Sequence, residues 1–112
     1  MCFDFAEQIG SLNSETRLQF YEILAHQLTI AARAVWSDDR LSLTEQRGQL
    51  IAINEILHRV AARVFNLRLQ TDEWTEADMI SSIYGWIQQS PDVTPLVSAA
   101  ITDSYGVVVK VC

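Results

Sequence analysis

Both histidines of the chain follow the tripeptide Glu-Ile-Leu, in the segments Glu22-Ile-Leu-Ala-His26 and Glu55-Ile-Leu-His58. Side chains three or four residues apart project from the same side of an α-helix, so each carboxylate can meet its imidazole. A carboxylate and an imidazole can share a metal ion, but metal sites built on Glu-x-x-His need further Glu ligands from other helices. We therefore interpret Glu22, His26, Glu55 and His58 first as surface Glu–His contacts and only second as metal ligands.

A second polar group lies on the helix predicted to follow Ser42. Asn54 and His58 are one turn apart within its broad apolar face, and Arg47 projects towards the same side. Buried polar groups must find hydrogen-bond partners, and such a pair can fix the register or oligomeric state of a helical bundle. The same three residues can instead line a ligand pocket between helices. In a catalytic version of that pocket, His58 would be the general base.

The three tryptophans form the third set of candidates. Trp36, Trp74 and Trp86 fall near the ends of predicted helices or off their apolar stripes, where we expect incomplete burial. Tryptophan is enriched at protein interfaces and among the residues that dominate their binding energy. These three side chains are therefore the predicted interface residues.

Composition and charge exclude several classes of function. The formal net charge of −6 opposes binding to nucleic acid, whose phosphates would repel the chain. No apolar run approaches the length of a membrane span. No phosphate-binding glycine loop, nucleophile elbow or zinc spacing is present, so no cofactor and no catalytic activity are expected. Cys2 and Cys112 stand at opposite ends without disulfide or ligand spacing, which favours reduced thiols and a cytoplasmic protein.

The elements that must position these residues are helices. A chain of 112 residues, 49% of them hydrophobic, is long enough for one domain with its own core, spanning residues 1–112. Helices are predicted over residues 14–36, 43–67, 76–89 and 94–105, the second of them opened by a capping box of Ser42 and Glu45. The fold class is therefore all-α, a four-helix bundle-like single domain with long first and second helices.

The first two predicted helices differ in the width of their apolar faces. Residues 14–36 carry one stripe, made of Phe20, Leu24, Leu28, Ala31 and Val35. Residues 43–67 carry a heptad-like register joined by further apolar positions, which predicts a central helix with neighbours on several sides. Arg59 and Arg63 are expected on its outer side, where they can pair with the acidic segment 72–78.

The two ends of the chain are expected to pack as straps. Phe3, Phe5 and Ile9 can cover the core from the N-terminal side. Gly106 is expected to end the last helix, and the β-branched residues of 107–111 favour a short strand. A lone strand is not stable, so this one would pair with residues 3–5 or with the same tail of a second subunit.

The function that these features favour is a non-catalytic helical protein-interaction module, self-associating as a homodimer or binding another protein partner. The alternative is a small-ligand or metal-binding protein that uses a cleft around Asn54 and His58.

Overall fold

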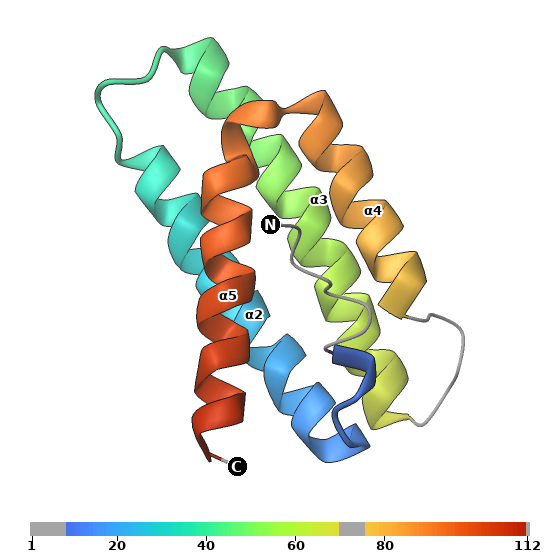
Figure 1. Cartoon of the computed structure of the whole chain (residues 1–112). Helices are drawn as coiled ribbons and strands as arrows, with labels where there is room; N and C mark the ends of the chain where they lie inside the picture. The colour runs from blue at the N-terminus through green and yellow to red at the C-terminus, as the bar shows by residue number, and fades with distance from the viewer. Residues whose placement is uncertain (1–8, 70–75, 112) are drawn as a thin grey trace.

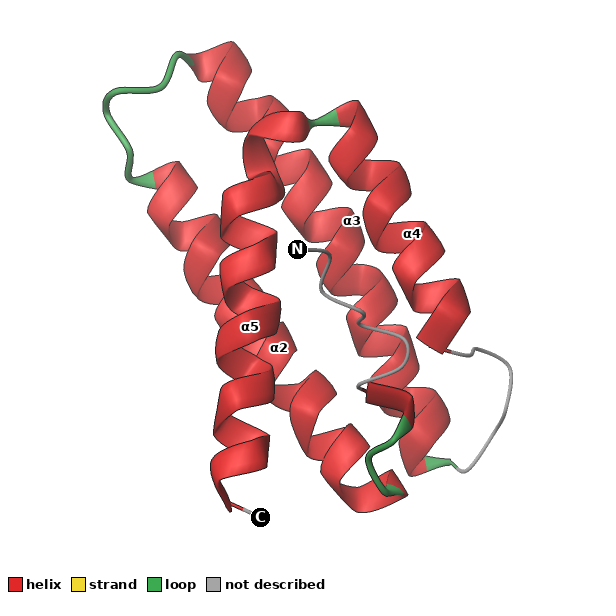
Figure 2. Cartoon of the chain, in the orientation of Figure 1, coloured by secondary structure: helices red, strands yellow, loops and turns green. Residues whose placement is uncertain are grey.

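The computed structural model describes residues 9–69 and 76–111, which form a bundle of helices. Their order along the chain is α2 (Ser14–Trp36), α3 (Leu43–Arg68), α4 (Glu76–Gln89), the short 3-10 helix η1 (Pro91–Val93) and α5 (Thr94–Val111) (Figure 1). No strand occurs within these described ranges (Figure 2). The all-α, bundle-like fold predicted from the sequence is confirmed.

Side-chain caps explain where the two long helices begin. The Oδ1 atom of Asn13 accepts a hydrogen bond from the Thr16 amide at 2.8 Å and so starts α2. At the start of α3, the Glu45 amide donates to Ser42 Oγ at 3.1 Å, while the Ser42 amide donates to Glu45 Oε1 at 3.0 Å. The predicted capping box is therefore formed, and α2 has the predicted bounds.

The helices pack in a fixed order around the core. α3 contacts α2 on one side and α4 on the other, and α5 runs beside α2 (Figure 1). The largest fully buried apolar side chains come from α2, α3, α4, η1, α5 and the segment before α2: Ile9, Phe20, Tyr21, Leu24, Leu28, Ile53, Ile56, Val60, Met79, Val93 and Val97. Ile9 thus packs as predicted, whereas Phe3 and Phe5 lie outside the described residues. Within residues 9–69 and 76–111, no helix combines the length and apolarity needed to cross a membrane.

The C-terminal segment corrects one prediction. Residues 107–111 are not a strand, because α5 continues through Gly106 to Val111. Val97, Ala100, Ser104 and Val108 recur at helical spacing and are all buried, and the Ser104 hydroxyl donates to the Ala100 carbonyl at 2.6 Å. The burial of this continuous helical stripe outweighs the weak β-propensity of the valines.

The orientation of α3 confirms most of the predicted register and corrects the placement of Arg63. Ile53 and Val60 of that register are buried, and Leu50, Leu57, Val64 and Leu67 pack against the core, whereas Leu43 is 73% exposed. Arg63, expected on the outer side, is 4% exposed and faces the core side of the helix.

The surroundings of Tyr21 explain how an arginine fits there. The guanidinium carbon of Arg63 lies 5.9 Å from the centre of the Tyr21 ring, and this ring meets Phe20 edge-on with centroids 5.1 Å apart. A cation over an aromatic face is stabilised by the ring's electron density, and the arginine stem packs as an apolar chain. Arg63 therefore takes a core position that a hydrophobicity pattern assigns to solvent.

Candidate functional site

The polar residues predicted to form a site lie on the outward face of α3. Asn54, His58 and Arg47 are all exposed, although the sequence pattern placed Asn54 and His58 within the helix's apolar face. The reason is that apolar residues surround most of α3, while α2 and α4 cover only the side that carries Ile53 and Ile56. The three residues therefore share a surface, and Asn54 alone of them lines a groove.

That groove, the α2–α3 groove, has a volume of about 380 Å³. Its lining residues are Thr29, Ala32, Arg33, Trp36, Ser37, Leu50, Asn54 and Leu57. Most of its lining surface is apolar, and its polar side chains are those of Thr29, Arg33, Ser37 and Asn54. Trp36 is 72% exposed at its edge, so a large aromatic surface adjoins the hollow.

Polar contacts join α2 to α3 on either side of the α2–α3 groove. Near the turn, the Gln46 amide nitrogen donates to the carbonyl oxygens of Asp38 at 3.0 Å and Trp36 at 3.4 Å. Towards the other end of α3, two turns or more beyond the groove, Arg68 Nη2 donates to Glu22 Oε2 at 2.9 Å. These contacts tie the two helices together at both ends of the pair.

Beside the groove runs a row of outward side chains that we name the α3 ridge. It consists of Leu43, Arg47, Ile51, Asn54, His58, Ala61, Phe65 and Leu69, spaced three or four residues apart. Leu43 is 73% exposed, Ile51 51%, Phe65 64% and Leu69 71%. The α3 ridge contains no Asp or Glu, although the chain has 14 acidic residues. It is an apolar strip with a few polar groups and one full positive charge.

The metal-ligand candidates are placed apart from one another. Glu22 pairs with Arg68 across the two helices, His26 and His58 are exposed, and Glu55 is half-buried. Among residues 9–69 and 76–111, no three His, Cys, Asp or Glu side chains lie close enough together to hold one metal ion. The arrangement found around Glu22 is an ion pair that ties α2 to α3.

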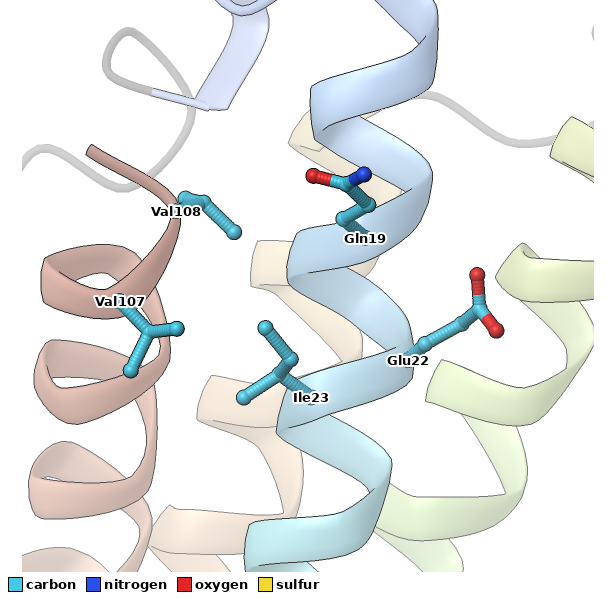
Figure 3. Close-up of a pocket in the computed structure, with 5 residues that line it drawn as sticks. All are labelled: Gln19, Glu22, Ile23, Val107 and Val108. Carbon is cyan, nitrogen blue, oxygen red and sulfur yellow. The ribbon is translucent and has the colours of Figure 1, made fainter. Parts of the chain in front are cut away.

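A second hollow, which sequence reasoning missed, lies between α2 and α5. It measures about 270 Å³ and is lined by Gln19, Glu22, Ile23, Val107 and Val108 (Figure 3). Ile23 and Val107 face each other across it, whereas the Glu22 carboxylate points away from α5 (Figure 3). The hollow exists because α5 remains helical beyond Gly106. The prediction of a strand over residues 107–111 therefore gave no indication of it.

The predicted interface tryptophans have different surroundings. Trp36 is exposed beside the α2–α3 groove, while Trp86 is half-buried and packs against the core. Trp74 lies outside the described residues, as do Cys2 and Cys112. Of the two tryptophans among the described residues, Trp36 is the more exposed.

Comparisons with protein-family models, with curated proteins and with solved structures found no match to this chain. Function is therefore inferred from the α3 ridge and the α2–α3 groove.

Proposed function

We propose that this chain is a non-catalytic helical interaction module that forms a homodimer through the α3 ridge and the adjoining α2–α3 groove. The observation that carries the proposal is the exposure of Leu43, Ile51, Phe65 and Leu69 along one side of one helix. Single exposed apolar residues are ordinary, but several large ones gathered on one side of one helix are more typical of an interaction site.

The energetics of this strip favour association. Removing apolar surface from water contributes about 25 cal/mol per Å², so full burial of a Leu, Ile or Phe side chain contributes about 1.5–3 kcal/mol. Trp36 adds a residue type that often dominates interface energies. The strip also lacks carboxylates, so the charge of −6 that repels copies elsewhere is not concentrated on it.

The proposal includes a cytoplasmic setting. Its support is the acidic, ordinary composition together with cysteines that have no disulfide-framework spacing.

Sedimentation velocity from about 1 to 500 µM tests the self-association. The wild-type protein should pass from monomer to dimer, and the double variant Ile51→Asp/Phe65→Asp should remain monomeric with an unchanged far-UV circular dichroism spectrum. Tyr84→Asp is the matched control, because Tyr84 is 50% exposed on α4, away from the α3 ridge. A wild-type protein that stays monomeric throughout, or a control that dissociates equally, contradicts the proposal.

A second candidate function, binding of a small ligand, is favoured by the size of the α2–α3 groove. Its volume of about 380 Å³ falls in the range of small-molecule pockets, and Asn54 offers a polar group among apolar walls. A ligand at a hundred times its dissociation constant should stabilise the fold by about 2.7 kcal/mol. A rise in melting temperature that is lost in Asn54→Ala but kept in His58→Ala, outside the groove, would favour this function, and no rise with any compound would exclude it for the compounds tried.

A further inference from the structure

We infer that the two copies pack antiparallel along the α3 ridge, about a two-fold axis that passes at the level of Ile56; this arrangement rests on the proposed self-association. In a two-fold contact, each residue meets the residue at the mirrored position of the other copy. The order of side chains along the α3 ridge suits such a contact.

Four pairs of ridge residues lie at equal distances on either side of Ile56. They are Leu43 with Leu69, Arg47 with Phe65, Ile51 with Ala61, and Asn54 with His58. Each pair is chemically complementary across the axis. Two pairs are apolar, one places a guanidinium against an aromatic ring, and one places an amide against an imidazole.

Repulsion between like charges favours the antiparallel arrangement over the parallel one. A parallel contact would place Arg47 against Arg47 and His58 against His58 of the second copy. The antiparallel contact separates the two Arg47 side chains by the 18 residues between positions 47 and 65, or roughly 27 Å along the helix. This separation is well beyond the screening length of about 8 Å at physiological salt.

The available area also explains why Trp36 belongs to the interface. α3 has 26 residues and is therefore about 39 Å long; with a helix diameter of about 10 Å, it presents roughly 400 Å² in projection. A stable dimer buries about 800 Å² on each partner. The shortfall must come from the α2–α3 groove and from Trp36, since a tryptophan can bury about 150–250 Å².

The central pair sets the register. Asn54 and His58 are the polar side chains nearest the axis of the α3 ridge, and an unpaired polar group in a dry interface costs free energy. A one-turn shift of the two helices along each other would place Asn54 against Asn54 and His58 against Leu50, or His58 against His58 and Asn54 against Ala62. Either shift leaves one polar group facing an apolar neighbour. The Asn54–His58 pair of two copies therefore favours one alignment, as single polar positions do in coiled coils.

Disulfide trapping tests the orientation. In a Cys2→Ser/Cys112→Ser background, Ile51→Cys and Ala61→Cys are made in separate chains, checked for wild-type melting temperature, mixed and mildly oxidised. The mixture should give predominantly the 51–61 cross-linked heterodimer, and either variant alone should cross-link several-fold more slowly. Predominant 51–51 cross-linking would contradict the antiparallel contact but leave self-association standing, whereas a cysteine-free background that never dimerises in sedimentation would overturn both.

A double-mutant cycle tests the register independently. Arg47→Ala and Phe65→Ala should each weaken dimerisation, and their combination should weaken it about two- to five-fold less than the product of the separate effects, as expected for a cation–aromatic pair. Arg47→Ala combined with Tyr84→Ala is the control and should be multiplicative. Multiplicative behaviour of Arg47 with Phe65 would contradict the proposed alignment.

Discussion

Helices α2 and α3 pack against each other, yet they distribute their apolar residues differently. In α2, the stripe of Phe20, Leu24 and Leu28 is completely buried, and it is the stripe that the sequence predicts. In α3, Ile53 and Ile56 are completely buried, while other large apolar side chains of the same helix face solvent. α2 leaves two large apolar side chains exposed, Ile30 and Trp36, whereas α3 leaves three, Leu43, Ile51 and Phe65, along one side of the helix.

The large apolar side chains that α3 leaves exposed are grouped rather than scattered over the helix. Its exposed apolar residues share one side of the helix, interleaved with Arg47, Asn54 and His58, and the row adjoins the α2–α3 groove at Asn54. Exposed apolar surface is expected on any protein, but exposed apolar residues gathered on one side of one helix more specifically indicate an interaction site. This is why the difference between the helices points to an interface.

The largest expected effect is the difference in unfolding free energy between substitutions on the buried and exposed faces of α3. Ile53→Ala should lower the free energy of unfolding by about 2–4 kcal/mol, because it leaves a cavity in the packed core. Ile51→Ala, a change of the same chemistry on the exposed face, should cost at most about 0.5 kcal/mol in the monomer. Urea unfolding at low micromolar concentration measures both. Equal costs would show that the faces have been assigned wrongly.

Two arginines of α3 extend the comparison to charged residues. Arg63→Ala should cost about 2 kcal/mol, since it removes both a buried side chain and the cation over the Tyr21 ring. Arg47→Ala on the α3 ridge should change monomer stability by less than about 0.5 kcal/mol. Thermal unfolding of the two variants at low concentration measures both stability changes. If Arg63→Ala is as stable as wild type, Arg63 does not contribute to the core.

The caps of α2 and α3 provide a smaller, sharper contrast. Asn13→Ala and Ser42→Ala should each cost about 1 kcal/mol, because each leaves a first-turn amide without its acceptor. Only the cap of α3 includes a carboxylate, so only it should depend on pH.

The direction of that pH dependence follows from Glu45. Hydrogen bonds from the Ser42 backbone amide, and then from its side chain, hold the pKa of the Glu45 carboxyl below its usual value of 4.5. A lowered folded-state pKa stabilises the fold fully above the unfolded value, and this contribution is lost as pH falls through the folded one. The melting-temperature difference between wild type and Glu45→Gln should therefore shrink between about pH 5 and pH 3. A difference that stays constant over this range would contradict the capping role of the carboxylate.

Helix starts were predictable from the sequence because they depend on local contacts. The Ser42–Glu45 box and the polar residue before Ser14 act within one turn, so composition at fixed spacing is enough to find them. The order and number of the long helices follow from these signals and from the periodicity of apolar residues.

The exposed face of α3 was not predictable in the same way. When apolar residues surround most of a helix, periodicity no longer identifies which part faces inward, and the neighbouring helices decide it. Arg63 adds to the error, because its burial depends on Tyr21, a partner 42 positions earlier in the chain. The α2–α3 groove was only partly anticipated: Asn54 was named, but Thr29, Arg33 and Trp36 join it through tertiary contact.

The prediction of a strand over the C-terminal part of α5 was wrong for a related reason. The valines at 107–109 favour strands by intrinsic preference, whereas the stripe from Val97 to Val108 favours a helix through burial. The regular spacing of Val97, Ala100, Ser104 and Val108 was a signal in the sequence, but the intervening Gly106 concealed it.

The most direct test of an interface on α3 is a residue-resolved dilution series. Amide resonances recorded by ¹H–¹⁵N correlation spectroscopy from about 10 to 500 µM compare the α3 ridge with the hollow between α2 and α5. We expect concentration-dependent shifts or broadening at Ile51, His58 and Phe65, and unchanged resonances at Gln19 and Ile23. Concentration dependence confined to the α2–α5 hollow, or absent from both regions, would contradict the claim that the outward face of α3 is the interface.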